Sequence, residues 1–152
     1  MTRVDFAFGA ADKLRMACEV SQKHYLAGRR IVIFSRAPAL LERLDRLLWA
    51  FQDTSFLPHA HMNDPLARHA GVVLAGTGDW ENLSNNQLSG NTDTWLLNLD
   101  NDCPPHADRF PRVLEIVSNE ETDRQRARDR WVIYKQAGYH VHAHDVSARP
   151  PS

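Results

Sequence analysis

The chain has 152 residues and a mass of 17.3 kDa, and 43% of its residues are hydrophobic, 24% charged and 9% aromatic. This length suits one domain, and this composition excludes disordered, collagen-like and low-complexity chains. Eighteen Lys and Arg residues against 19 Asp and Glu residues give a net charge of −1, which excludes nucleic-acid binding by bulk positive charge.

Apolar patterns predict alternating strands and helices. Residues 4–8 alternate around an apolar face and indicate a first strand that ends at Gly9. Helical spacing then runs from about residue 11 to residue 27 and stops at Gly28. Residues 30–34 form a nearly continuous apolar run, which is typical of a strand that is covered on both faces and favours a parallel sheet.

The next helix is predicted from its start signals and its leucines. Ser35 is an N-cap candidate and Pro38 suits the first turn. Hydrophobic residues then repeat with helical spacing as far as Phe51, opposite a charged face. The pattern predicts a helix with one buried side.

The second half of the chain continues the alternation. Further strands are predicted at residues 71–75, 94–99 and 112–117. A Gly-, Asn- and Ser-rich stretch at residues 76–92 separates the first two, as a surface loop or a short irregular helix.

A last helix is predicted after these strands. Ser118 or Asn119, followed by acidic residues, opens the helix, and Gly138 ends it. Residues 139–142 then indicate a short edge strand.

The order of these elements predicts the fold class. Alternating strands and helices, with no repeat and no linker, indicate one α/β domain at residues 1–147 and a polar tail at residues 148–152. We expect a three-layer fold with a mainly parallel, Rossmann-like sheet and helices on both faces.

The sequence lacks the motifs of nucleotide-binding and hydrolytic sites. No P-loop, nucleophile elbow or CxxC pair is present. After Gly76-Thr77-Gly78, Glu81 stands where the third glycine of a dinucleotide fingerprint belongs. We therefore expect no catalytic residues and no cofactor.

Two histidine groups are candidate metal ligands. His140, His142 and His144 alternate on one side of an extended segment, and His59 and His61 form a similar pair. Such clusters can hold zinc or nickel. No Cys, Asp or Glu converges in the sequence to complete either site, so we expect no metal.

The chain carries no signs of export or membrane insertion. The first residues lack a basic stretch followed by an apolar run, and every apolar run is far shorter than the ~18 residues of a membrane span. Cys18 and Cys103 lie in unlike contexts, which suits structural thiols in a reduced compartment. We expect a cytoplasmic protein that does not bind membranes.

The last predicted helix is unusually rich in arginine. Steps of four, three and four residues place Arg124, Arg128, Trp131 and Lys135 on one stripe. The arginines either pair with local acids on a solvated face or surround an aromatic pocket. A pocket of this kind would receive an acidic peptide with a free terminal carboxylate. Stacking of single-stranded nucleic acid on Trp131 is the competing use.

A second aromatic group follows the leucine-rich helix. Trp49 and Phe56 stand at or just after its end, before a Pro-containing extended segment. Core packing explains either residue alone. Together, at a junction between helix and loop, they predict a hydrophobic docking patch for another protein.

These segments resemble the chi subunit family of bacterial DNA polymerase III holoenzyme, a family of clamp-loader accessory proteins. The order of elements matches over about residues 3–142. The residues that carry the resemblance are Leu44-Asp45-Arg46-Leu47-Leu48-Trp49, Ser55-Phe56-Leu57-Pro58-His59, Arg124 to Arg128, Trp131 and Tyr134-Lys135-Gln136-Ala137-Gly138-Tyr139.

The resemblance implies a non-enzymatic adaptor that grips the acidic, Phe-ending C-terminal tail of single-stranded-DNA-binding protein and ties it to the clamp loader. DNA is then reached indirectly. On the family pattern, Arg124 and Arg128 meet the carboxylates of the tail, while Val117 and Trp131 accept its terminal ring. The family typically has Tyr in place of Trp131, and the indole keeps the flat apolar wall without the phenolic hydroxyl.

The same resemblance implies a second partner. Trp49 and Phe56 fall in the region that contacts the psi subunit, or a helicase partner that uses the same surface. Where psi is missing, this patch serves another partner or the clamp loader directly.

Two hypotheses of other classes remain open. One is direct single-stranded nucleic-acid binding through the arginine-rich helix. The other is an enzyme that acts on nucleotides, which needs a perturbed carboxylate or histidine at the carboxyl edge of the sheet. The carboxylates available there are Asp79, Asp93, Asp100 and Asp102.

Overall fold

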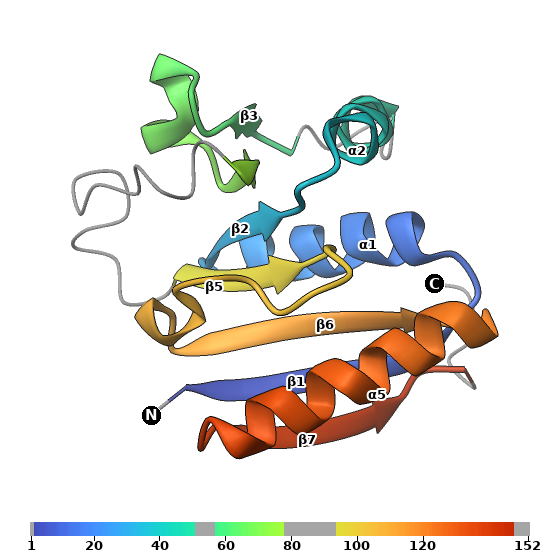
Figure 1. Ribbon diagram of the computed structural model, residues 1–152. Coiled ribbons are helices and arrows are strands. Elements are labelled where there is room, and N and C mark those ends of the chain that lie inside the picture. Colours follow the sequence, from blue (N-terminus) through green and yellow to red (C-terminus); the bar gives the residue numbers. More distant parts are fainter. Residues whose placement is uncertain (1, 51–56, 78–93, 148–152) are drawn as a thin grey trace.

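The structure is a computed structural model that describes residues 2–50, 57–77 and 94–147. Strands and helices alternate along these residues (Figure 1). In chain order the elements are β1 (Arg3–Ala10), α1 (Lys13–Leu26), β2 (Arg30–Phe34), α2 (Pro38–Ala50), β3 (His59–His61), η1 (Pro65–His69), β4 (Val72–Ala75), β5 (Thr94–Asn98), η2 (Ala107–Arg109), β6 (Arg112–Ser118), α5 (Glu121–Gln136) and β7 (His140–Asp145).

The described strands form one sheet in the order β3-β4-β2-β5-β6-β1-β7. Every neighbouring pair is parallel. Strand β1 lies between β6 and β7, and its register with β6 shifts between Phe8 and Ala10. The predicted α/β class with a Rossmann-like parallel sheet is confirmed.

Helices cover both faces of the sheet. Helix α5 crosses β6, β1 and β7 on one face, and α1 lies on the other (Figure 1). The central strand β2 divides its side chains accordingly. Val32 and Phe34 pack in the same cluster as Ala127 of α5, whereas Ile31 and Ile33 pack with α1 and α2. This alternation is the period of two that an extended strand imposes, and it explains the continuous apolar run.

Helix α2 begins and packs as its sequence predicts. The N–H of Ala37 donates to Oγ of Ser35 at 3.1 Å, so Ser35 satisfies an amide before the first turn. Leu41, Leu44 and Leu48 form its buried face.

The structure differs from the prediction at two edge strands. Strand β3 was not predicted, because three residues reading His-Ala-His have no strand pattern of their own and pair only through β4. Strand β7 extends to Asp145, further than predicted, because it pairs with β1 from Arg3 to Phe8.

Several expectations concern residues outside the described part of the chain. They include most of the loop expected at residues 76–92 and the tail at residues 148–152. Among the helices that the structure describes, none combines the length and the apolar character needed to cross a membrane.

Candidate functional site

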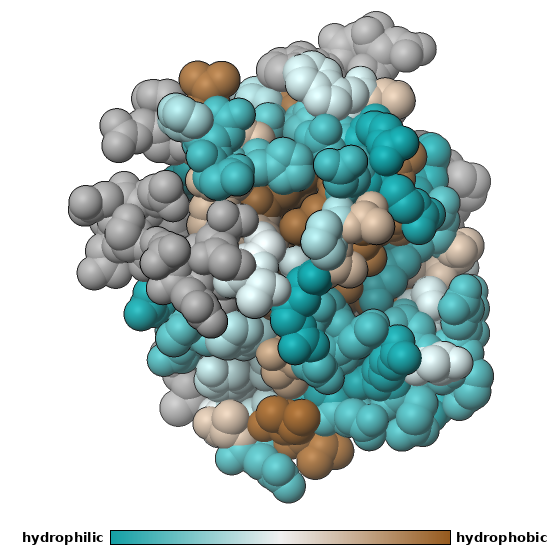
Figure 2. Space-filling model, turned by 45° about the horizontal axis from the view of Figure 1, so that its top comes forward, coloured by the Kyte–Doolittle hydropathy of each residue, from teal (hydrophilic) through white to brown (hydrophobic). Residues whose placement is uncertain are grey.

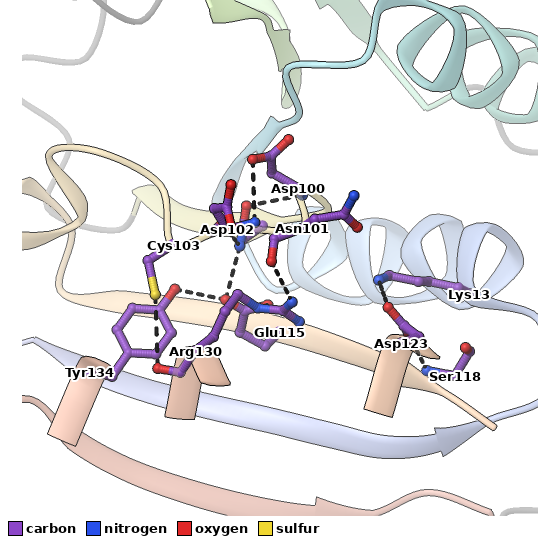
Figure 3. A network of polar contacts seen from close by, with 11 residues as sticks. Lys13, Asp100, Asn101, Asp102, Cys103, Glu115, Ser118, Asp123, Arg130 and Tyr134 are labelled. Atoms are coloured by element: carbon purple, nitrogen blue, oxygen red, sulfur yellow. Dashed lines mark hydrogen bonds and ion pairs between the residues drawn. The ribbon is translucent and has the colours of Figure 1, made fainter. Parts of the chain in front are cut away.

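The first turn of α5 is tied to the rest of the molecule by Asp123. Its Oδ2 accepts the N–H of Ser118 at 2.8 Å, and its Oδ1 accepts from Nζ of Lys13 at 3.0 Å, so one carboxylate joins α5, β6 and α1 (Figure 3). Burial raises the pKa of the Asp123 carboxyl, but the Ser118 amide and the Lys13 ammonium outweigh it and bring the pKa below its ordinary value. The charge also lies at the positive end of the helix dipole.

A buried ion pair lies beneath the middle of α5. Nε of Arg130 donates to Oε1 of Glu115 on β6 at 3.1 Å, and these side chains are 2% and 0% exposed. Oε2 of Glu115 accepts from the Tyr134 hydroxyl at 2.7 Å and from Nδ2 of Asn98 at 2.9 Å. Nη1 of Arg130 also donates to the carbonyl of Asn101 at 2.9 Å (Figure 3). The network therefore fixes which side of α5 faces the sheet.

Sequence reasoning missed this pair, because charged residues in an arginine-rich helix suggest a solvated surface. Two signals were present. Glu115 interrupts an otherwise apolar strand, and Arg130 lies on the same helical stripe as Ala127 and Tyr134, both of which are buried.

With this side of α5 held inward, its flank forms one wall of a cavity of about 620 Å³. The other walls come from β1, from the carboxyl end of β6 with Asn119, and from β7 with Ser147. All four residues expected at the tail site line this cavity: Val117, Arg124, Arg128 and Trp131. Residues far apart in the sequence thus meet at one place.

The apolar part of the cavity is built around Trp131. Its ring is half-buried and packs on Phe6, with the ring centroids 5.3 Å apart. Val117 and Ala127, both buried, line the cavity beside it, and Phe8 contributes a ring that is 41% exposed. One face of the indole is engaged in the core, so Trp131 offers a wall to a ligand instead of an open stacking platform.

Two exposed arginines form the polar rim. Nη1 of Arg124 lies 3.6 Å from Oε2 of Glu121, and Nη1 of Arg128 lies 3.3 Å from Oε1 of the same residue. Each arginine side chain is 53% exposed and Glu121 is 71% exposed. Ion pairs this exposed contribute only about 0–1 kcal/mol, so an incoming carboxylate can replace Glu121 at little cost. The expected local pairing and the expected pocket therefore coexist.

The side of the cavity opposite α5 carries features that the sequence did not predict. Asp145 and Ser147 reach it through β7. Gly9 also lines it with φ +88°, and a Cβ built on Gly9 would lie 2.8 Å from Cβ of Ser147. Only a residue without a side chain fits here without displacing Ser147, and Gly9 lies at the register shift between β1 and β6. The cavity can thus hold an anion and an apolar group together.

The second predicted patch is described only in part. Trp49, near the end of α2, is 60% exposed, and its ring meets His59 edge-on with centroids 4.8 Å apart. Nε2 of His59 lies 3.2 Å from Oδ1 of Asp45 on α2. Hydrophilic residues cover most of the face shown in Figure 2, with smaller hydrophobic areas between them. Phe56 lies outside the described residues.

The carboxylates considered for catalysis have structural partners where they are described. Asp100 accepts from the N–H of Arg36 at 3.0 Å and from its Nε at 2.8 Å, and Asp102 binds the same guanidinium. Asp79 and Asp93 lie outside the described residues.

The histidines do not form a metal cluster in the described part of the chain. There, no three His, Cys, Asp or Glu side chains gather as a metal ion requires. Nε2 of His144 instead lies 2.9 Å from Oδ1 of Asp5, and Nε2 of His59 and His61 approach Asp45 at 3.2 and 4.0 Å.

Comparison with known proteins identifies relatives along almost the whole chain. The family model described as DNA polymerase III chi subunit, HolC, matches residues 1–142. DNA polymerase III subunit chi of Pseudomonas aeruginosa is 32% identical over 148 residues, which cover 95% of this chain and 96% of that protein. DNA polymerase III subunit chi of Escherichia coli is 27% identical over 127 residues, which cover 84% of this chain and 81% of that protein.

Proposed function

Because this chain belongs to the DNA polymerase III chi subunit family, we propose that it is a non-catalytic accessory subunit that links the clamp loader to single-stranded-DNA-binding protein during DNA replication. The link is made by binding the acidic C-terminal tail of that protein. One observation carries this proposal: Val117, Arg124, Arg128 and Trp131 line the same cavity. The cytoplasm is the proposed location.

The chemistry of the cavity supports an acidic peptide that ends in an aromatic residue. Arg124 and Arg128 stand one helical turn apart, and their guanidinium charges favour anions; Arg124 lies in the first turn of α5, where the helix dipole adds to this effect. Val117 and Trp131 supply an apolar wall beside them. A free terminal carboxylate and a terminal ring would use both parts at once, and a neutral or internal segment would use only one.

We propose a separate role for the exposed indole of Trp49. It would contact the psi subunit, a helicase partner, or the clamp loader directly. Helix α2 packs on the sheet face opposite α5, which supports two partners bound at the same time. The tail site would reach DNA indirectly, through single-stranded-DNA-binding protein.

A calorimetric titration tests the tail proposal. The purified protein is titrated with a synthetic acidic peptide ending in Pro-Phe and with the same peptide amidated at its C-terminus. We expect saturable one-to-one binding that amidation abolishes and that weakens with added salt, since exposed charges are screened. Equal binding of the amidated peptide would contradict a site for the terminal carboxylate.

Two alanine variants locate the site. Arg128→Ala removes a charged hydrogen bond and should cost about 1.5–3 kcal/mol, roughly a 10- to 150-fold loss of affinity. Arg126→Ala is the matched control, because this exposed arginine lies on the same helix but does not line the cavity. It should bind within about twofold of the original chain. Unchanged affinity of Arg128→Ala would exclude this cavity.

A further inference from the structure

A second concentration of positive charge lies at the amino ends of the strands, away from the cavity. It surrounds Trp95, the second residue of β5. Cζ of Arg29 lies 4.5 Å and Cζ of Arg112 lies 4.6 Å from the centroid of the Trp95 ring, and the His24 ring centroid lies 4.6 Å from it. We call Lys23, His24, Arg29, Trp95 and Arg112 the strand-end cluster.

Neither arginine of the strand-end cluster forms a close ion pair within the described part of the chain. There, Nη1 of Arg29 lies 3.1 Å from Nδ1 of His24, and no carboxylate forms an ion pair with Arg29 or Arg112. Arg112 also stands directly opposite Arg3 in the parallel register of β6 and β1. Like charges in this position repel, and the Asp5 carboxylate lies 3.0 Å from Arg3 and also attracts Arg112 from beyond ion-pair distance.

The imidazole of His24 responds to this local charge. Burial lowers its pKa, and the neighbouring Arg29, Lys23 and Arg112 lower it further, to about 4. A net charge of −1 on the whole chain therefore conceals a positive region at this edge of the sheet. Positive regions of this kind attract polyanions over distances beyond direct contact.

We propose that the strand-end cluster binds the phosphate backbone of single-stranded DNA. Guanidinium forks match phosphate oxygens, and planar guanidinium groups, held here against the Trp95 ring, also stack on bases of any sequence. Trp95, Arg112, Arg3 and His140 stand at the starts of four adjacent strands, a row of about 14 Å at ~4.8 Å per strand. A short row of this kind suits an extended single strand.

This contact would be additional to the tail site and independent of it. Arg112 begins β6, and Val117 of the cavity lies next to its last residue, so the two surfaces occupy opposite ends of one strand. With few cations available, we expect a Kd of about 10⁻⁶–10⁻⁴ M, the range of non-specific nucleic-acid binding.

Fluorescence anisotropy with a labelled 15-nucleotide oligo-dT tests the proposal at several salt concentrations. The variant Arg29→Glu/Arg112→Glu should bind at least tenfold more weakly. Its salt dependence should fall by about 1.4 in slope, from two phosphate contacts at ~0.7 each. The control Arg43→Glu/Arg46→Glu makes the same charge change on exposed positions of α2 and should bind within about twofold of the original chain.

A milder variant keeps the test valid if the double variant misfolds, because Arg29 and Arg112 both pack on Trp95. Lys23 is exposed and has no ring contact with Trp95, so Lys23→Glu keeps that packing and should weaken DNA binding about threefold. In the unmodified protein, the Trp95 indole resonance, assigned with Trp95→Phe, should shift as oligo-dT is added.

Three results would overturn the proposal. The first is equal DNA binding by Lys23→Glu and the original chain, with an unmoved Trp95 resonance. The second is loss of DNA binding on Arg124→Glu/Arg128→Glu alone, which would assign it to α5. The third is equal affinity for a polyglutamate peptide of matched charge, which would indicate an acidic protein partner. Retained binding of the Pro-Phe peptide by the strand-end variants separates this test from that of the tail site.

Discussion

Replacing Arg130 with methionine tests whether the buried ion pair holds α5 on the sheet. Methionine keeps an unbranched apolar stem but removes the donors to Glu115 and to the Asn101 carbonyl. Breaking a buried pair from one side costs about 3–5 kcal/mol, because a charge is left without its partner. Tyr134 and Asn98 still donate to Glu115, so we expect the lower end, about 3 kcal/mol.

Urea unfolding followed by circular dichroism measures this loss. Total stabilities of about 5–15 kcal/mol are usual, so Arg130→Met should still fold. With a denaturant slope of ~2 kcal/mol per molar, its midpoint should fall by about 1.5 M urea. The double variant Glu115→Leu/Arg130→Met removes both charges and should be less destabilised than the two single variants combined.

The stability of Arg130→Met should also depend on pH. Burial raises the pKa of the Glu115 carboxyl, and Arg130 opposes that rise. Without Arg130, the folded-state pKa rises further above the ordinary value of 4.5. When the pKa of a group is higher in the folded state, its contribution to stability is complete below the unfolded-state pKa and is lost as pH rises through the folded-state pKa. The loss of unfolding free energy in Arg130→Met should therefore grow from pH 4 to pH 8. A loss below ~1 kcal/mol, or strictly additive single and double variants, would refute the reasoning.

Three further predictions concern the first turn of α5, the cavity and the exposed Trp49. Asp123→Asn should lower the free energy of unfolding by about 1–2 kcal/mol at pH 7, because the N–H of Ser118 then loses its charged carboxylate acceptor. The stability that comes from the lowered pKa of Asp123 is present above the unfolded pKa of 3.8 and is lost as pH falls through the lower folded pKa, so the unfolding curves of the variant and the original chain should approach each other in acid. Gly9→Ala should lower the free energy of unfolding by about 1–2 kcal/mol and weaken peptide binding, since the φ of Gly9 is +88° and a Cβ there would collide with Ser147. Unchanged unfolding and unchanged peptide affinity would contradict this steric argument. Trp49→Ala should change unfolding by less than ~1 kcal/mol and leave peptide affinity intact while weakening the second partner. A larger loss of stability would mean that Trp49 belongs to the core.

The regular elements were predictable where a segment carries its own periodicity. Strand β2 and helix α2 follow their apolar patterns, because each buries a face along its whole length. Strand β3 and the end of β7 were missed or shortened, because their pairing depends on distant neighbours and their side chains are mostly polar.

The candidate site was predictable on α5 and not on the opposite wall. Helical spacing and the family resemblance predicted Arg124, Arg128 and Trp131, because all three lie on one helix. Gly9 and Asp145 reach the cavity only through the pairing of β1 with β7, and no local signal marks that pairing in the sequence.

Resonance mapping of the peptide complex tests the central claim most directly. The acidic peptide ending in Pro-Phe is added to protein labelled at Val methyl and Trp indole groups. We expect the Val117 methyl and Trp131 indole signals to shift together and to saturate at one equivalent, while the Trp49 indole signal stays in place. Shifts confined to Trp49, or equal shifts with the amidated peptide, would contradict a tail site between α5 and the end of the sheet.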